Sequence, residues 1–352
     1  MNLKSTIAKG IGMIIILSPQ AVDSDLDELV TNLKDRGYGV HVSKGVEKTI
    51  VGVIGAHDDD KLVIAEQLSS LAYVERVVPI LKPYKVVSRE FHPDKTVIKV
   101  GGVDIGGDKI IVMAGPCAVE SEEQTMEVAR AVKEAGASIL RGGAFKPSTS
   151  PYSFHGLGED ALKILAAARE ATGMPIITEV MDTRDVELVA RYADILQVGT
   201  RNMTNFALLQ EVGVIRKPVM LKRGMSSTIE EWLQAAEYIA NRGNYEIILC
   251  ERGLRTFETY TRNTFDVSAI PAVLELSHLP IIADPSHGTG RYQLVPAVAK
   301  AAVAAGADGL MIEVHPNPAK ALKDGAQSLT PANFATMMTE TAAVARAVGR
   351  YL

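Results

Sequence analysis

The N-terminal part of the chain alternates short apolar runs with longer stretches in which apolar residues recur every three or four positions. The short runs are typical of strands, and the longer spacing is typical of amphipathic helices. The predicted order is β-α-β-β-α-β, with strands at 13–17, 39–43, 49–54 and 74–80 and helices at 25–36 and 60–71. This order is typical of a split-βαβ, ferredoxin-like α+β domain, which we place at residues 1–85.

The first segment contains no Cys or His cluster and no glycine-rich phosphate loop, so we expect it to be regulatory or structural rather than catalytic. After it, the pattern is interrupted at Pro83, Pro93, Gly101 and Gly102. Prolines and glycines at this density favour turns, so residues 86–109 are predicted to be a linker with a short hairpin.

From residue 110 onward, short apolar runs alternate with longer helical stretches eight times. This alternation is typical of parallel strands joined by crossover helices. The predicted strands are 110–114, 138–141, 175–179, 195–198, 218–222, 247–250, 280–284 and 309–313. Helices are predicted at 122–135, 161–171, 228–241 and 294–305, among others. Eight β/α units predict a closed (β/α)8 TIM barrel of the α/β class at residues 110–352, with an open doubly wound sheet as the alternative.

The apolar run at 11–17 follows Lys4 and Lys9, as in the basic and apolar regions of a signal peptide. The run is short, however, and no convincing small-residue cleavage site precedes the acidic stretch at 23–27, so we predict a buried strand there. No run approaches the ~20 residues that a membrane-spanning helix needs.

Charge and cysteine content narrow the class of protein further. The net charge of −5 disfavours a nucleic-acid or anionic-membrane partner, although it does not describe local patches. Only Cys117 and Cys250 are cysteines, whereas a secreted protein of this size more often uses several disulfides. We therefore expect a cytoplasmic protein.

Polar residues occur at the end of every predicted barrel strand. In a barrel these ends converge on one mouth, where catalytic groups lie. Five of the residues are cations, which bind phosphate and carboxylate groups: Arg141, Lys146, Arg201, Lys222 and Arg252. They predict an anionic ligand with more than one phosphate or carboxylate group. We also expect backbone N–H groups at Gly142, Gly143 and 288–290 to approach such anions.

Four further residues at or just after strand ends supply sulfur, nitrogen and oxygen donors that suit zinc, iron or manganese. They are Cys117, His287, Glu313 and Asp324, with His315 and His155 as rival ligands. The alternative for Cys117 is a small core residue, because a lone cysteine in an apolar region usually packs. Cys250 is interpreted as such a packing residue.

The motifs at the strand ends are, in order, AGPCAVE (114–120), GGAFKP (142–147), VGTRNM (198–203), LKRG (221–224), ERGLRT (251–256), PSHG (285–288) and IEVH (312–315). Together they resemble the 3-deoxy-D-arabino-heptulosonate 7-phosphate (DAHP) synthase family, most closely its type Iβ branch. The resemblance covers the whole barrel. The N-terminal segment is similar to the ferredoxin-like, ACT-like regulatory domain of some members.

The resemblance implies a transferase that joins phosphoenolpyruvate to erythrose 4-phosphate, the first step of the shikimate pathway to aromatic amino acids. It implies one divalent metal ion bound by Cys117, His287, Glu313 and Asp324, and it does not choose among manganese, iron, cobalt and zinc. It assigns the five cations to phosphoenolpyruvate, with His287 close to its reacting end. The resemblance implies that Lys146 donates a proton or orders the attacking water. The sequence does not decide how the proton-transfer steps are divided between Lys146 and Glu179.

The second substrate is less well specified, because the chain departs from the family there. The resemblance places erythrose 4-phosphate along Lys146, Pro147, Ser148, Thr149 and Ser150, where the family usually has Lys-Pro-Arg-Thr. Ser148 replaces the Arg that would contact the aldose phosphate. Either the replacement is neutral, or Arg291 or another nearby cation compensates, or the site favours a different aldose.

Two other functions are considered. One is 3-deoxy-D-manno-octulosonate 8-phosphate synthase, which uses arabinose 5-phosphate; Pro147 and the N-terminal segment argue against it. The other is a non-catalytic, effector-binding barrel, which the intact metal and phosphoenolpyruvate residues oppose. The resemblance further implies inhibition by tyrosine or phenylalanine, which would bias the N-terminal domain towards covering the mouth, and a homotetramer.

Overall fold

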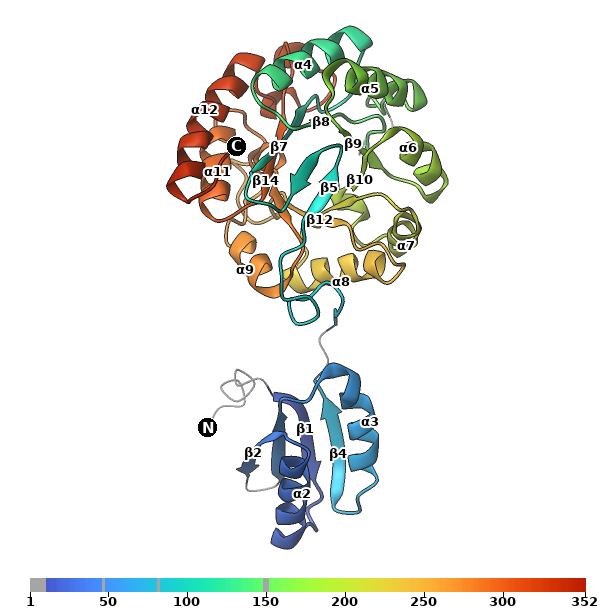
Figure 1. Cartoon of the computed structure of the whole chain (residues 1–352), viewed down its shortest axis with the longest axis vertical. Coiled ribbons are helices and arrows are strands. Elements are labelled where there is room, and N and C mark those ends of the chain that lie inside the picture. Colours follow the sequence, from blue (N-terminus) through green and yellow to red (C-terminus); the bar gives the residue numbers. More distant parts are fainter. Residues whose placement is uncertain (1–10, 46–47, 81–82, 148–151) are drawn as a thin grey trace. The chain divides into compact units, whose positions relative to one another are not determined.

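A computed structural model describes residues 11–45, 48–80, 83–147 and 152–352 of the protein. The chain divides into two compact units, Met1–Pro83 and Tyr84–Leu352 (Figure 1). The first unit contains an antiparallel sheet in the order β2-β3-β1-β4 and two helices. The elements are β1 (Ile11–Leu17), α2 (Asp23–Asp35), β2 (Gly39–Lys44), β3 (Thr49–Ile54), α3 (Asp58–Ser69) and β4 (Val74–Pro79). This strand order confirms the predicted ferredoxin-like fold.

Alternate residues of β1 build the core of the first unit. Met13, Ile15 and Leu17 are buried, and Leu29 and Leu33 of α2 lie in the same cluster. Successive side chains of a strand point to opposite faces, so every second residue of β1 faces the helices. The buried strand predicted at 13–17 is therefore confirmed.

The second unit is a closed barrel of eight parallel strands, which excludes the open-sheet alternative. The strands are β7 (Ile111–Gly115), β8 (Ile139–Arg141), β9 (Ile176–Val180), β10 (Ile195–Val198), β11 (Val219–Lys222), β12 (Ile247–Glu251), β13 (Ile281–Ala283) and β14 (Gly309–Glu313). Ile111, Met220 and Cys250 belong to the cluster that fills the interior, so Cys250 is a packing residue, as predicted.

Helices surround the barrel in an outer layer (Figure 1). They are α4 (Glu122–Glu134), α5 (Glu159–Thr172), α6 (Val186–Tyr192), α7 (Phe206–Val214), α8 (Ile229–Ala240), α9 (Ala269–Leu276), α11 (Val295–Ala304) and α12 (Pro331–Ala347). The short helix α10 (Pro285–Thr289) instead directly follows β13, at the carboxyl ends of the strands. Single 3-10 turns occur at η1 (Thr183–Asp185), η2 (Thr200–Asn202), η3 (Pro318–Lys320) and η4 (Gly325–Gln327). The helix α10 forms where the sequence was expected to make a glycine-rich loop.

A hairpin of β5 (Ile98–Val100) and β6 (Val103–Ile105) closes one end of the barrel. Its Ile98, Val100 and Ile105 are part of the interior cluster, and Figure 1 shows β5 lying across the barrel centre. A Cβ atom on Gly101 would meet Pro175, which precedes β9. The hairpin therefore closes the end at which the strands begin, leaving the other end for the functional groups.

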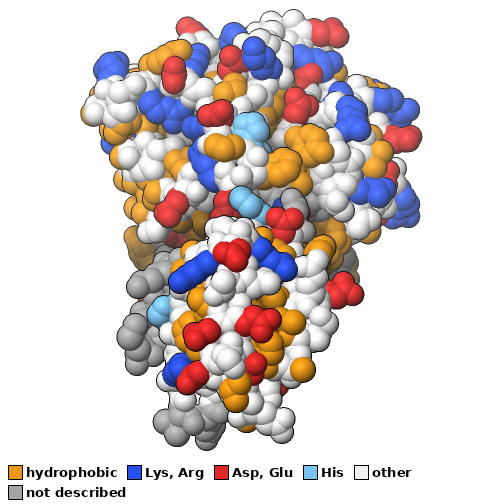
Figure 2. Space-filling model, turned by 60° about the horizontal axis from the view of Figure 1, so that its bottom comes forward, with side chains coloured by type: hydrophobic (Ala, Val, Ile, Leu, Met, Phe, Trp, Pro, Cys, Tyr) orange, Lys and Arg blue, Asp and Glu red, His pale blue; other side chains and the backbone are white. Residues whose placement is uncertain are grey.

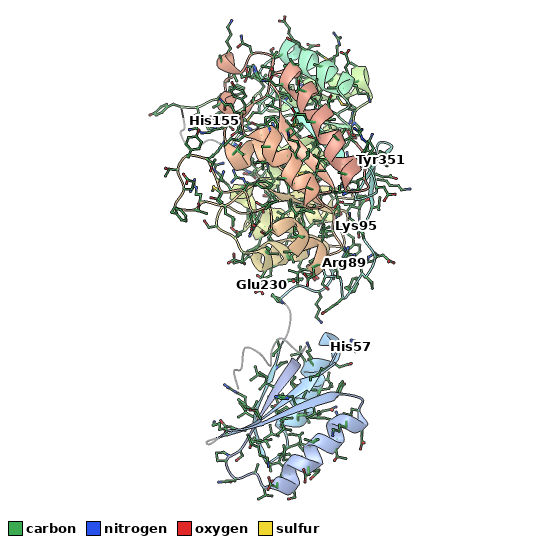
Figure 3. The ribbon with its side chains drawn as sticks, turned by 90° about the vertical axis from the view of Figure 1, so that its left-hand side faces the viewer. His57, Arg89, Lys95, His155, Glu230 and Tyr351 are labelled. Carbon is green, nitrogen blue, oxygen red and sulfur yellow. The ribbon has the colours of Figure 1, made fainter. Side chains whose placement is uncertain are left out.

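The rest of the segment predicted as a linker also packs on the barrel. The backbone N–H groups of Val86 and Val87 donate to the carboxylate of Glu237, at 2.9 and 3.1 Å. Lys95 forms an ion pair with the buried Asp308, and Figure 3 shows Arg89 and Lys95 at the edge of the barrel. These contacts explain why the second unit begins at Tyr84.

The C-terminal residues are tied to the start of β7. The N–H of Ile110 donates to the carbonyl of Tyr351 at 2.7 Å, and Arg350 donates to the carbonyls of Gly107 and Ala307 at 2.6 and 2.9 Å. These contacts join the beginning and the end of the barrel sequence at one seam.

Charged side chains of both signs are interspersed on the face shown in Figure 2. Within the described part of the chain, every helix is too short or too polar to cross a membrane.

Candidate active site

A cavity of about 380 Å³ lies at the carboxyl ends of the barrel strands. It is lined by Arg141, Lys146, Pro147, Ser153, Glu179, Gln197, Gly199, Thr200, Arg201, Lys222, Met225, Arg252, Arg255, Arg262, Asn263, His287, Lys323 and Asp324. All five cations expected at the mouth are among these residues. The barrel therefore brings together side chains that are far apart in the sequence.

Four of the five cations are buried, and Arg201 is exposed. The Nη1 atom of Arg141 donates to the carbonyl of Pro116 at 2.7 Å and lies 3.1 Å from Glu313 Oε1. Lys222 forms an ion pair with Asp284. The Nε atom of Arg252 is buried and has no hydrogen-bond partner among the described residues. Because unpartnered buried donors are rare in proteins, this atom points to an anionic ligand.

Cys117, Glu313 and Asp324 form a cluster of potential metal ligands. One donor atom from each lies within 4.8 Å of the others. The Sγ atom of Cys117 is 3.3 Å from Asp324 Oδ2, and burial raises the pKa of the Cys117 thiol to about 12. Glu313 Oε1 is buried and accepts no hydrogen bond from a described residue. Thiolate and carboxylate donors at this spacing fit a divalent transition-metal ion, which would displace the thiol proton.

The fourth expected ligand, His287, is oriented towards this cluster by Asp284. Its Nδ1 atom lies 2.8 Å from Asp284 Oδ2, and its Nε2 atom lies 3.5 Å from Glu313 Oε1. Burial lowers the pKa of His287 despite the neighbouring carboxylates. A neutral imidazole that donates from Nδ1 has a free lone pair on Nε2, as a metal ligand requires.

Neighbouring basic side chains lower the pKa values of the two carboxylates of the cluster, His287 by the charge it carries when it is protonated at low pH. Burial alone would raise both pKa values, but His287 and Arg141 hold the pKa of Glu313 below its ordinary value. Arg262 and His287 lower the pKa of Asp324 to about 2. Both side chains therefore carry negative charge at neutral pH.

Two residues that the sequence analysis missed connect these carboxylates. The Nη1 atom of Arg262 donates to Asp324 Oδ1 at 3.1 Å and to Gln327 Oε1 at 2.8 Å. Gln327, which is buried, donates from Nε2 to Glu313 Oε2 at 2.7 Å. Each carboxylate thus has one oxygen held by this pair and one left for another partner. No motif or periodicity in the sequence marks either residue.

Glu179 and Gly199 form one wall of the cavity. Burial raises the pKa of Glu179, and Gln197 Nε2 donates to its Oε2 at 3.3 Å. A Cβ atom on Gly199 would lie 1.9 Å from Glu179 Oε1. Any other residue at this position would force the Glu179 carboxylate to move.

Other predicted site residues lie outside this arrangement. His315 is held by Glu120, with His315 Nε2 3.4 Å from Glu120 Oε2, and the exposed His155 lies at the barrel edge in Figure 3. Arg291 donates to the carbonyl of Tyr260 at 2.7 Å and lines a neighbouring cavity. Pro147 lines the site, whereas Ser148, Thr149 and Ser150 lie outside the described residues.

The expectation that glycine N–H groups bind anions is wrong for four residues. Gly142 and Gly143 donate to the carbonyls of Ile177 and Cys117, and Gly288 and Gly290 donate to carbonyls of Asp284 and Ser286 within α10. Strand pairing and helix formation use these N–H groups, so the candidate anion-binding groups of this cavity are side chains.

Comparison of the chain with known proteins identifies its family. A model of the DAHP synthetase I family matches residues 90–347, and a model of the DAHP synthase ferredoxin-like domain matches residues 13–82. The chain belongs to the DAHP synthetase I family. Among its relatives is the phospho-2-dehydro-3-deoxyheptonate aldolase of Thermotoga maritima, 51% identical over 96% of this chain and 99% of the relative.

Members of the family have been solved as structures. The crystal structure of the Thermotoga maritima DAHP synthase aligns with a TM-score of 0.80 at 50% identity, covering 96% of this chain and 98% of the other. A more distant relative is the 2-dehydro-3-deoxyphosphooctonate aldolase of Syntrophotalea carbinolica, 36% identical over 66% of this chain and 90% of the relative. The N-terminal match is the feature that links the whole chain to DAHP synthases.

Proposed function

We propose that this protein is a DAHP synthase that condenses phosphoenolpyruvate with erythrose 4-phosphate, giving DAHP and inorganic phosphate. The observation that carries the proposal is a cavity lined by five cations, His287 and Asp324, with the donor atoms of Cys117 and Glu313 within 4.8 Å of that of Asp324. Cations suit an enol phosphate with a carboxylate, and the donor set suits the activation of an aldehyde.

Cys117, His287, Glu313 and Asp324 would hold the divalent metal ion. The fit is supported by Glu313 Oε1, which accepts no hydrogen bond from a described residue, and by the mutual approach of the Cys117, Glu313 and Asp324 donor atoms. When bound, the ion supplies Lewis acidity to the aldehyde oxygen. Its identity is set by affinity and availability rather than by these ligands alone.

The cations hold the charged groups of phosphoenolpyruvate out of bulk water. Arg141 and Lys222 are buried and fixed by their own partners, so they bind the carboxylate and phosphate groups with little loss of side-chain freedom. Arg252 is also buried, and its Nε atom has no hydrogen-bond partner among the described residues and can donate to the same anion. The exposed Arg201 completes the set at the solvent side. C3 of phosphoenolpyruvate is then directed at the aldehyde carbon.

The bond between these two carbons forms as the enol phosphate donates its π electrons. Positive charge develops at C2, where water adds and loses one proton to give a phosphorylated hemiketal. The hemiketal hydroxyl loses its proton as the C2–O bond to phosphate breaks, which leaves the ketone of DAHP and inorganic phosphate. Lys146 is placed to protonate the new alkoxide, because its Nζ atom lies 3.1 Å from Cys117 Sγ, beside the metal ligands. Burial opposes its charge, but Cys117 and nearby carboxylates raise the pKa of Lys146, so it remains a proton-carrying ammonium.

The test is an assay of the full-length protein with Mn²⁺, phosphoenolpyruvate and either erythrose 4-phosphate or arabinose 5-phosphate. The expected product is DAHP, with phosphate released in equal amount. A preference for arabinose 5-phosphate would replace the proposal with the octulosonate reaction. Absence of turnover with both aldoses would favour a non-catalytic barrel.

We extend the proposal to regulation and assembly. The ferredoxin-like domain contains no catalytic cluster among its described residues, and we expect it to bind tyrosine or phenylalanine as an inhibitor. The proposed assembly is a homotetramer, and the proposed location is the cytoplasm, which the two unpaired cysteines favour.

A further inference from the structure

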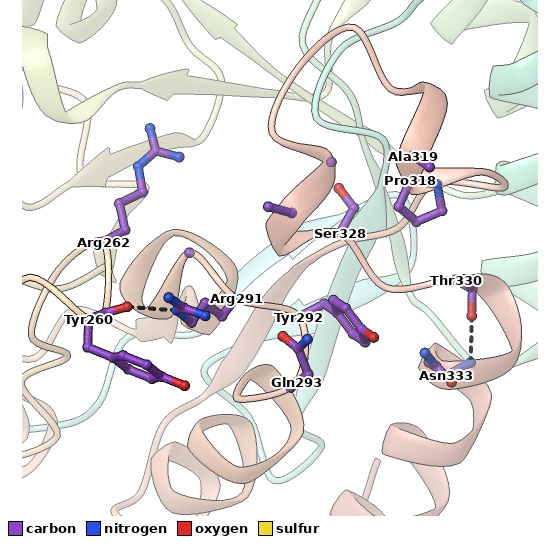
Figure 4. Close-up of a pocket in the computed structure, with 13 residues that line it drawn as sticks. Tyr260, Arg262, Arg291, Tyr292, Gln293, Pro318, Ala319, Ser328, Thr330 and Asn333 are labelled. Carbon is purple, nitrogen blue, oxygen red and sulfur yellow. Dashed lines mark hydrogen bonds between the residues drawn. The ribbon is translucent and has the colours of Figure 1, made fainter.

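A second cavity, of about 760 Å³, lies beside the proposed active site (Figure 4). It is formed by the loop after β12, the residues that follow α10, and the loop from β14 to α12. Figure 4 shows Tyr260, Arg262 and Arg291 on one side, Pro318 and Ala319 on the other, and Tyr292 between them. Its volume is in the range of small-molecule sites.

The charge of this cavity is positive. Arg262 and Arg291 line it, and none of the described lining residues is acidic. Arg291 is held in place, because its Nε atom donates to the carbonyl of Tyr260 and its guanidinium lies 4.0 Å from the centre of the Tyr260 ring. Tyr292, Pro318, Ala319 and Ala326 give the remaining lining an apolar character. Such a lining suits an anion with a flat apolar body.

Arg262 connects this cavity to the proposed metal centre, because its side chain lines both cavities. Its Nη1 atom contacts Asp324 and Gln327, and Gln327 in turn contacts Glu313. Among the described residues, the other guanidinium nitrogens of Arg262 have no hydrogen-bond partner, and its side chain is 38% exposed. A carboxylate in the second cavity can therefore bind Arg262 from the side opposite Asp324.

We propose that the second cavity binds a small carboxylate with a flat apolar body and no ammonium group, and that this ligand tightens metal binding through Arg262. The first part stands on the cavity alone, whereas the coupling rests on the proposed metal centre. An ammonium group is disfavoured because the described lining offers it no carboxylate partner. This requirement distinguishes the ligand from a free amino acid.

The sign of the coupling follows from the position of Arg262. A cation that contacts Asp324 opposes the approach of a divalent ion, and a bound carboxylate offsets its charge. Conversely, a metal ion shares the charge of Asp324 and leaves Arg262 more available to the carboxylate. Both effects favour joint binding, and thermodynamic linkage makes them equal in size.

Calorimetry of the full-length protein tests the proposal with benzoate as the probe and phenylalanine as the comparison. Because phenylalanine is also expected to bind the N-terminal domain, only binding that a substitution in the second cavity weakens is assigned to this cavity. Saturating benzoate should lower the Kd for Mn²⁺ by about fivefold, at the small end of known couplings. The variant Ala319→Trp fills the cavity from an exposed position. It should weaken benzoate binding at least about tenfold and leave the Kd for Mn²⁺ unchanged. Ala347→Trp, at an exposed position outside the cavity, is the matched control.

Arg262→Gln tests the connection itself. It should remove the effect of benzoate on Mn²⁺ affinity, whatever it does to that affinity alone. Benzoate binding that survives Ala319→Trp, or phenylalanine binding that Ala319→Trp weakens as much as it weakens benzoate binding, would overturn the site. If benzoate still changes the Mn²⁺ affinity of Arg262→Gln, the coupling does not pass through Arg262. If Mn²⁺ does not bind, the metal centre and the coupling both fail, and the benzoate titrations still decide whether the cavity is a binding site.

Discussion

At the scale of single residues, the buried charges of the site are held by one another. Lys222 pairs with Asp284, which also orients His287, and Arg141 lies against Glu313. Burying an unpaired charge costs several kcal/mol, so removing one member of a pair should destabilise the fold. Arg252 Nε and Glu313 Oε1 have no hydrogen-bond partner among the described residues, which makes them candidates to contact the proposed anion and the proposed metal ion.

Replacing Cys117 tests the metal centre. Cys117→Ala removes a donor that lies within 4.8 Å of the Glu313 and Asp324 donors. Loss of a direct ligand should lower Mn²⁺ affinity and turnover by more than about 100-fold, the upper range for supporting residues. Chelation of the wild-type protein should have the same effect and be reversed by added metal. Cys250→Ala, in the barrel interior, is the control for loss of a buried thiol. Full activity of Cys117→Ala would refute the ligand assignment.

Replacing Ser148 tests the predicted binding of the second substrate, erythrose 4-phosphate. A charge-assisted contact is worth roughly 1.5–3 kcal/mol, against about 1 kcal/mol for a neutral hydrogen bond. We therefore expect Ser148→Arg to lower the KM for erythrose 4-phosphate by about tenfold, while the KM for phosphoenolpyruvate stays unchanged. Steady-state kinetics with each substrate varied in turn measures both values. An unchanged erythrose 4-phosphate KM would mean that Ser148 is a neutral replacement.

At the scale of elements, the barrel made most of the site predictable. The carboxyl ends of parallel strands must meet at one mouth, so Arg141, Lys222 and Arg252 could be grouped from the strand pattern alone. The pair of Arg262 and Gln327 could not, because both lie in loops without periodicity, and no sequence signal shows that these loops meet. The α10 helix was also missed, since it is short and contains glycine.

The side chain of Asp284, at the start of the short helix α10, makes several contacts at once. Asp284 Oδ1 accepts from the His287 N–H at 3.0 Å, so one side chain caps the helix, orients the imidazole and neutralises Lys222. Asp284→Ala should lower the free energy of unfolding by about 3–5 kcal/mol, because it leaves Lys222 buried and unpaired. Thr228→Ala, which removes the cap of α8, is the control and should cost about 1 kcal/mol. Denaturant unfolding measures both, and equal losses would show that Asp284 acts only as a cap.

At the scale of the whole molecule, the chain combines two units that differ in fold and in chemical content. The sequence showed both folds, because the spacing of apolar residues changes from one unit to the next. It did not show that residues 86–109 pack on the barrel, because the buried contacts of Val87 and Lys95 depend on surfaces far away in the sequence.

A protein that begins at Tyr84 should therefore retain the barrel and its activity. It should also lose inhibition by tyrosine or phenylalanine, if the N-terminal domain is the regulatory one. A truncated form of the Thermotoga maritima enzyme has been solved, and it aligns over 76% of this chain with a TM-score of 0.72. Turnover with and without each amino acid, measured on both lengths of the protein, checks the prediction. A truncated protein that is still inhibited would place the effector site on the barrel.

The seam between Tyr351 and Ile110 has a consequence for biosynthesis. Arg350 and Tyr351 are synthesised after all eight barrel strands, yet they bind residues just before β7. During translation the strands emerge in order, but the ring lacks these contacts until residues 350 and 351 have also emerged from the ribosome. Completion of the barrel is therefore a late step that follows the synthesis of its last strand. For the same reason, an affinity tag fused directly to Leu352 would crowd the seam, whereas a spacer would move the tag away from it.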